Sequence, residues 1–217
     1  MIFTGPYLNI VFLSLYVSLI AVILSAVLSI IISSSLVINN FKGKEFILLL
    51  FSSLMSLPPV VIGLILYILF SSSGALGFMN LLYTPSIMIL AQLLIITPIV
   101  ITLSYQVLSN LYVIHHEYLF SLHASTTKKL YTIILEGRND LLITLLTGLG
   151  RALSEVGAVI IVGGNIAHNT RVMTTSIVLE TSRGDLNLAL SLGVTLLFIA
   201  ILLNIIIFYL KKKMTYE

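Results

Sequence analysis

The chain has 217 residues, of which 59% are hydrophobic and only 9% are charged, and its mean hydropathy is +1.15. In soluble domains about a quarter of all residues are charged, so this composition excludes a water-soluble globular protein. The absence of cysteine excludes disulfides and thiolate metal sites, and the net charge of +3 comes from a few basic residues at loop ends, which favours membrane topology over nucleic-acid binding.

Long apolar runs without charge predict an all-α membrane protein. No charged residue occurs in 1–41 or in 46–116, and a transmembrane helix needs about 20 apolar residues. A membrane β-barrel would show short alternating segments instead. We therefore expect one transmembrane domain over 1–217, with about five spans, over 7–38, 46–70, 86–113, 141–163 and 186–210.

Two longer polar segments, 115–140 and 164–185, separate the later spans, and the basic residues predict which side each faces. Positive residues gather on the cytoplasmic side of a membrane. With a cytoplasmic C-terminus and an external N-terminus, the inner segments hold most of the basic residues: Lys42, Lys44, Lys128, Lys129, Arg138, Lys211, Lys212 and Lys213. The 115–140 segment is then a cytoplasmic loop and 164–185 an outer loop.

The second predicted span contains Pro58 and Pro59, followed by Gly63. Proline removes a backbone donor and clashes with the preceding turn, so the helix should kink or break within the membrane. Such a break is tolerated where neighbouring helices or a cavity satisfy the freed carbonyls, and it often lines a pathway. The alternative is a kink that serves packing alone.

Arg151 and Glu155 are the charges closest to the bilayer interior, inside the fourth predicted span. Intramembrane charges are costly and usually face the interior of the bundle or a wet cavity. Their four-residue spacing places both on one face of a helix, where they can pair. We expect them, with nearby Gly157, at a pathway or a subunit contact; a self-neutralising structural pair is the alternative.

The 115–140 segment combines charge with apolar residues that are typical of short helices. In the cytoplasm such a surface is expected to dock a partner, although a helix lying on the lipid is an alternative. A zinc site at His115, His116 and His123 is not expected, because the spacing is unusual and no further ligands are evident. The predicted docking residues are Glu117, Tyr118, Leu119, Leu122, His123, Lys128, Lys129, Ile133 and Leu135.

The 164–185 segment and the residue before it are rich in hydroxyl groups and carry one early guanidinium. Arginine and hydroxyl donors match the oxygens of a tetrahedral anion, but an arginine in a polar loop is more often solvated. We expect an outer face that includes Gly163, Gly164, Asn165, Thr170, Arg171, Thr174 and Thr175.

No catalytic or nucleotide-binding motif occurs in the sequence. The glycines at 43 and 163–164 do not have the spacing of a phosphate-binding loop, and neither H-E-x-x-H nor G-x-S-x-G is present. The chain is therefore predicted to bind no cofactor or metal and to be no enzyme. If ATP drives its function, ATP and magnesium must be held by a separate subunit.

Three motifs in chain order resemble the membrane subunit of ABC importers for molybdate, tungstate and sulfate, and within that group the tungstate carriers in particular. They are Leu57-Pro-Pro-Val-Val-x-Gly63, then Gly150-Arg-Ala-Leu-Ser-Glu-Val-Gly-Ala158, and Val162-Gly-Gly-Asn-Ile166 continuing through Thr170-Arg-Val-Met-Thr-Thr175. The resemblance covers nearly the whole chain.

The resemblance also extends to a cytoplasmic coupling helix with the family pattern Glu-Ala-Ala…Gly…Ile-x-Leu-Pro. Glu117, Ile133 and Leu135 agree with it. The two alanines are replaced by Tyr118 and Leu119, the glycine by His123 and the proline by Glu136. The bulkier residues predict a divergent partner surface.

What the resemblance implies is a permease subunit in a bacterial or archaeal plasma membrane. Two copies of the chain would enclose the path, a separate ATPase subunit would drive it, and an extracytoplasmic oxyanion-binding protein would deliver tungstate. Molybdate or another oxyanion is the first alternative. A proton-coupled carrier that uses Glu155 and a membrane scaffold without transport activity are alternatives of other classes.

Overall fold

The computed structural model describes the backbone of residues 5–215 and the side chains of 5–212, and this part of the chain contains helices and loops but no strand. The all-α prediction is confirmed. The elements are α1 (Gly5–Ile38), α2 (Lys44–Leu54), α3 (Pro59–Phe70), the short 3-10 helix η1 (Gly77–Met79), α4 (Pro85–Ser121), α5 (Thr126–Glu136), α6 (Arg138–Leu153), α7 (Gly157–Gly163), α8 (Met173–Arg183) and α9 (Leu186–Thr215).

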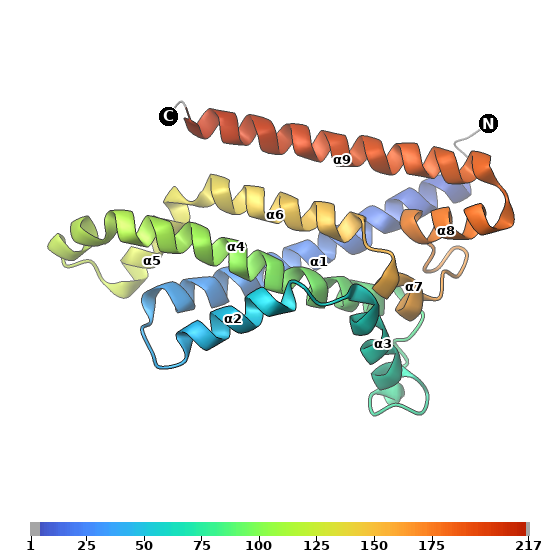
Figure 1. The fold of residues 1–217 in the computed structure, drawn as a ribbon, viewed down its shortest axis with the longest axis horizontal. Coiled ribbons are helices and arrows are strands. Elements are labelled where there is room, and N and C mark those ends of the chain that lie inside the picture. The colour runs from blue at the N-terminus through green and yellow to red at the C-terminus, as the bar shows by residue number, and fades with distance from the viewer. Residues whose placement is uncertain (1–4, 216–217) are drawn as a thin grey trace.

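The molecule is an elongated bundle in which α1, α4, α6 and α9 follow the long axis (Figure 1). Among the described residues, three helices are long and apolar enough to cross a membrane: α1, α4 and α9. The pairs α2–α3 and α6–α7 pass the same test together but are bent by 95° and 59°. If each bent pair counts as one span, the total is five, as the sequence predicts.

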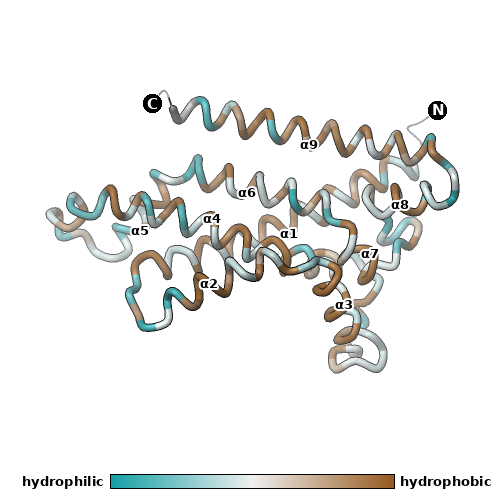
Figure 2. The backbone as a smooth tube through the Cα atoms, in the orientation of Figure 1, coloured by the Kyte–Doolittle hydropathy of each residue, from teal (hydrophilic) through white to brown (hydrophobic). Residues whose placement is uncertain are grey.

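Polar residues gather at the two ends of the bundle, and apolar residues fill its middle (Figure 2). One end, which we call the α5 end, holds the turn between α1 and α2, helix α5 and the end of α9 (Figure 1). The other, the α8 end, holds α8 and the start of α1. The basic residues on which the orientation prediction depends lie in the segments of the α5 end, except that the side chain of Lys213 lies outside the described residues. The orientation in the membrane stays a prediction.

Helix α4 packs against α1 in the middle of the bundle. Ile87, Met88, Ile96 and Val100 on α4 are fully buried. The buried side of α1 carries instead a series of small residues, which lets the two backbones approach closely: Ser14, Ser18, Ala21, Ser25, Ser29 and Ser33. The large apolar side chains of α1, such as Phe12 and Ile31, are exposed, as expected where the surrounding solvent is lipid.

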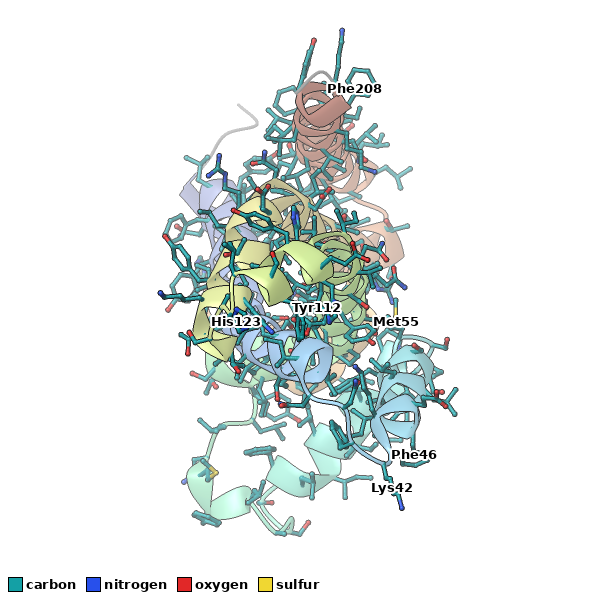
Figure 3. The ribbon with its side chains drawn as sticks, turned by 90° about the vertical axis from the view of Figure 1, so that its left-hand side faces the viewer. Lys42, Phe46, Met55, Tyr112, His123 and Phe208 are labelled. Carbon is teal, nitrogen blue, oxygen red and sulfur yellow. The ribbon has the colours of Figure 1, made fainter. Side chains whose placement is uncertain are left out.

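Helices α9 and α2 lie on opposite sides of the bundle when it is viewed along its long axis (Figure 3). Figure 3 shows the bundle from the α5 end, with Phe208 of α9 at one extremity and Lys42 and Phe46, at the start of α2, near the other. Phe46 is 68% exposed and Phe208 63% exposed. Both helices thus turn apolar surface outward.

Two predicted spans differ from the structure. The third is predicted to end at 113, but α4 continues to Ser121, because the sequence offers no helix breaker there. The fourth is two helices, α6 and α7, rather than one, whereas the second is divided into α2 and α3 at the prolines, as predicted.

The 164–185 segment is not an open loop, since it contains α8. Thr174, Thr175, Ser176 and Glu180 of α8 are buried. The hydroxyls of Thr174 and Thr175 are hydrogen-bonded inside the bundle, since buried hydroxyl groups usually find partners, whereas 166–169 and 181–185 are exposed.

Candidate functional site

The first break in the bundle lies between α2 and α3. The last backbone hydrogen bond before it joins Leu57 N–H to the Leu54 carbonyl, at 3.2 Å. Pro58 then adopts an extended conformation, with φ −63° and ψ 123°, and Pro59 begins α3. A residue before proline avoids helical angles, and proline is well tolerated in the first turn of a helix. The proline pair therefore ends one helix and starts the next, which confirms the predicted break.

The second break lies between α6 and α7, at residues 154–156. Arg151 Nη2 lies 3.7 Å from Glu155 Oε2, so the two charges form an ion pair, and the side chain of Arg151 is 45% exposed while that of Glu155 is 6% exposed. The two are not on one helix face, because α6 ends at Leu153. Glu155 Oε1 instead accepts a hydrogen bond from the backbone N–H of Gly157, at 3.0 Å.

Side chains from other helices satisfy backbone carbonyls at this second break. Gln92 of α4 donates from Nε2 to the Ala152 carbonyl at 3.1 Å, and the Thr174 hydroxyl of α8 donates to the Glu155 carbonyl at 3.0 Å. These groups line a cavity of about 10 Å³ together with Ser14 and Ser18 of α1. The break is thus a buried polar cluster inside an apolar bundle.

Gln92 and the two serines of α1 are site residues that the sequence interpretation missed. Gln92 is 5% exposed, and its Oε1 atom is buried without a hydrogen-bond partner among the described residues. One signal is present in the sequence: Gln92 is an amide in the apolar first half of α4, well before Gln106 and Asn110, and a polar group inside a membrane segment usually faces a partner or a cavity.

The two breaks lie against each other because α3 packs on α7. A Cβ atom on Gly63 would lie 2.7 Å from the Cα of Ala158, and one on Gly157 would lie 2.6 Å from Cγ2 of Val60. Backbones this close require glycine. The structure therefore brings together the six residues predicted for a pathway, which are Pro58, Pro59, Gly63, Arg151, Glu155 and Gly157.

The residues predicted for an outer face at the α8 end mostly hold the fold together. The Thr170 hydroxyl donates to the Gly163 carbonyl and accepts from the Ile166 N–H, and the Thr175 hydroxyl donates to Asn165 Oδ1 at 2.9 Å. Thr170, Thr174 and Thr175 are buried. Of the predicted set, Gly164 is exposed, and Asn165 and Arg171 are half-buried.

At the α5 end, the predicted docking residues separate into two groups. Leu119 and Ile133 are buried in a core with Leu108 and Leu141, where they hold α5 against α4. Lys129 is half-buried. The exposed members are Glu117, Tyr118, Leu122, His123, Lys128 and Leu135. The turn that joins α4 to α5 places His123 at φ +49°, in the left-handed region.

Within the described residues, no group of three or more histidine, cysteine or acidic side chains is arranged to hold a metal ion.

Comparison with known proteins identifies the family. No family model matches the chain. The chain is 41% identical to a tungstate uptake system permease protein of Peptoclostridium acidaminophilum, over 94% of this chain and 90% of that protein. It is also 41% identical to a tungstate uptake system permease protein of Campylobacter jejuni, over 80% of this chain and 72% of the other.

The chain belongs to the ABC transporter permease family. A probable anion ABC transporter permease protein of Haloferax volcanii is 36% identical, over 88% of this chain and 84% of that protein. The permease is therefore a multi-pass protein of the plasma membrane and a transport component rather than an enzyme. Permeases of this family work in general with an ATPase and a binding protein.

Proposed function

We propose that this permease carries tungstate into the cell. The proposal depends above all on the 41% identity to the tungstate uptake permease of Peptoclostridium acidaminophilum, which extends over 94% of the chain. We further propose that two copies of the permease enclose the path, that a separate ATPase subunit binds ATP and magnesium, and that an extracytoplasmic binding protein delivers the anion. The permease itself binds neither cofactor nor metal.

We assign the path to the surface beside the two helix breaks. A helix break inside a membrane frees backbone groups that only a cavity or neighbouring protein can satisfy. Here Gln92 and Thr174 satisfy two such carbonyls, and Glu155 keeps a buried carboxylate beside them. The half-exposed Arg151 guanidinium extends from this cluster to the protein surface. A cation there would favour passage of a dianion.

We assign coupling to the exposed side of the α5 end. Tyr118, Leu122 and Leu135 expose apolar surface there, at 61%, 59% and 46%. Lys128 adds positive charge at the start of α5. Because Ile133 fixes α5 to the core that contains Leu108 and Leu141, a push on α5 would be passed to α4 and α6.

The experiment is uptake into liposomes that hold the permease, the ATPase subunit and the binding protein. We expect ATP-dependent accumulation of tungstate, with molybdate and sulfate added as competitors. Omission of the ATPase is the control and should abolish uptake.

Two alternatives remain distinct outcomes of the same experiment. Stronger uptake of molybdate or of another oxyanion would identify a different substrate in the same machine; the relative of Haloferax volcanii is named only for an anion. Uptake by the permease alone, driven by a pH gradient and indifferent to ATP, would instead identify a proton-coupled carrier that uses Glu155.

A further inference from the structure

An open cavity lies at the α8 end, between the start of α1 and the segment that precedes α8. Its volume is about 340 Å³, and eight residues line it: Pro6, Asn9, Ile10, Phe12 and Leu13 from α1, and Ala167, His168 and Arg171 from the other side. None of the eight is acidic. The polar side chains that line it are Asn9, His168 and Arg171.

Two arginines of the described residues, Arg138 and Arg171, form no ion pair, and of these Arg171 lies at the α8 end. Arg151 pairs with Glu155, and Arg183 pairs with Glu180 at 3.4 Å, but no carboxylate of the described residues lies within 4.0 Å of Arg171. Its guanidinium donates one long hydrogen bond, from Nη2 to the Asn165 carbonyl at 3.4 Å, and its Nε is buried without an acceptor. A buried donor without an acceptor is costly, so the side chain has both charge and donors to offer.

The segment that carries Arg171 is held rigidly. The Ile166 carbonyl accepts hydrogen bonds from the backbone N–H groups of Asn169, Thr170 and Arg171, at 3.2, 3.0 and 3.1 Å. Asn165 and His168 adopt left-handed angles, with φ +50° and +63°. Such angles are unfavourable for residues other than glycine and persist only where the surrounding structure imposes them. Strained backbone of this kind is frequent at ligand sites. The guanidinium therefore starts from a fixed backbone.

We propose that this cavity binds a tetrahedral oxyanion group through the guanidinium of Arg171, with Asn9 and His168 as further polar contacts. The planar fork of an arginine matches two oxygens of such a group at once. An inorganic oxyanion and the phosphate of a lipid headgroup share this chemistry. The identity of the inorganic anion as tungstate rests on the proposed function and on the predicted orientation, in which the α8 end faces outward and first meets the delivered anion.

The first test is equilibrium dialysis of the purified full-length permease, in a detergent without phosphate, against tungstate. We expect Arg171→Gln to weaken tungstate binding by about 10- to 100-fold, the loss expected for hydrogen bonds to a charged group. Arg183→Gln, an ion-paired arginine at the same end, is the matched control and should change binding less than about twofold. If Arg171→Gln binds tungstate as well as the wild type does, the proposal that this cavity binds the inorganic anion is wrong.

The second arm uses dihexanoyl phosphatidylglycerol as the probe in the same dialysis. Binding of this lipid that depends on Arg171, with no binding of tungstate, assigns the cavity to a lipid phosphate. If neither probe binds in an Arg171-dependent way, the proposed site is wrong. Asn9→Leu, which leaves the Arg171 segment intact, repeats the test with a second variant, and thermal unfolding checks that each variant is folded.

The liposome experiment separates this proposal from the proposed function. Tungstate uptake by the complete system with unaltered binding in Arg171→Gln would remove the site and leave the function in place. Uptake of a different oxyanion, with Arg171-dependent binding of that anion, would keep the proposed site and reject tungstate as the substrate.

Discussion

Gly63 of α3 lies so close to Ala158 of α7 that a Cβ atom on Gly63 would be 2.7 Å from the Cα of Ala158. This contact joins the two broken spans of the permease. Gly63 follows the break at the prolines, and Ala158 follows the break at Glu155. A movement of one broken span would therefore displace the other.

Gly63→Ala should therefore destabilise the permease. The obstacle is backbone, which cannot rotate away, and overpacking a tight contact costs about 1–3 kcal/mol in the free energy of unfolding. Thermal unfolding of the purified protein measures the effect. Gly150→Ala is the matched control: nothing lies within 4 Å of its added Cβ, and alanine in a helix is favoured by up to about 1 kcal/mol. Equal melting temperatures for the two variants would mean that the α3–α7 contact is loose.

Glu155→Ala should cost more stability than Glu155→Gln. Alanine leaves the Gly157 N–H without its carboxylate acceptor, a loss of about 1–3 kcal/mol, whereas glutamine keeps an acceptor oxygen at the same position. Arg151→Ala should cost more than the roughly 1 kcal/mol of an exposed ion pair, because it leaves the buried carboxylate of Glu155 without its positive partner.

The same variants test the path in the reconstituted complex. We expect Glu155→Ala to bind the ATPase normally and to lose most tungstate uptake. Normal uptake by this variant would remove Glu155 from the transport path.

His123→Gly should stabilise the permease by about 1 kcal/mol. The left-handed angle of His123 is unfavourable for any residue with a Cβ atom, and the family pattern that the sequence resembles has glycine there. Gly184→Ala is the reverse control, since Gly184 has φ +82°, and it should destabilise by a similar amount. Chemical unfolding of the two variants beside the wild type gives both values. A lower stability of His123→Gly would mean that the contact between His123 Nδ1 and the Ser121 carbonyl, at 3.2 Å, stabilises the fold by more than the strained angle destabilises it.

Reversal of charge at Lys128 and Lys129 should weaken association with the ATPase by about 10-fold or more, as expected when a rim charge opposes its partner. The double change to glutamate does not threaten α5, because acidic residues are favoured in the first turn of a helix. Lys42→Glu, exposed at the same end but outside α5, is the control. Co-purification of the complex at low salt measures association, and equal loss in both variants would point to a nonspecific charge effect.

Stability at high pH should report the contact between Tyr67 and Tyr83. A hydrogen bond with Tyr67, with some help from burial, raises the pKa of Tyr83 above its ordinary value of 10.0. A raised pKa in the folded state means that this stabilisation is present below pH 10 and is lost as the pH rises through the folded pKa. Tyr67→Phe should bring the tyrosinate absorbance of Tyr83 to lower pH, with Tyr83→Phe identifying that signal by difference. An unchanged titration would contradict the hydrogen bond.

Much of the fold follows from local patterns in the sequence. Scarce charge and long apolar runs predict helices in a bilayer, because unpaired backbone groups are not tolerated in lipid. Pro58 and Pro59 determine a break, since no other residue removes a donor and restricts its predecessor. Arg151 and Glu155 are close enough in the sequence to pair, although α6 ends between them and they share no helix face.

Only the tertiary structure decided where these features meet. Gln92 donates to a carbonyl 60 residues away, and Thr174 donates to one 19 residues away. Sequence periodicity carries no information on such partners. For the same reason, the sequence predicts a polar outer loop over 164–185, although Thr174 and Thr175 of α8 are buried. Their polarity is visible in the sequence, whereas the partners that permit burial come from other elements. The sequence determined which residues break helices, and packing of α3 on α7 determined that both breaks form one site.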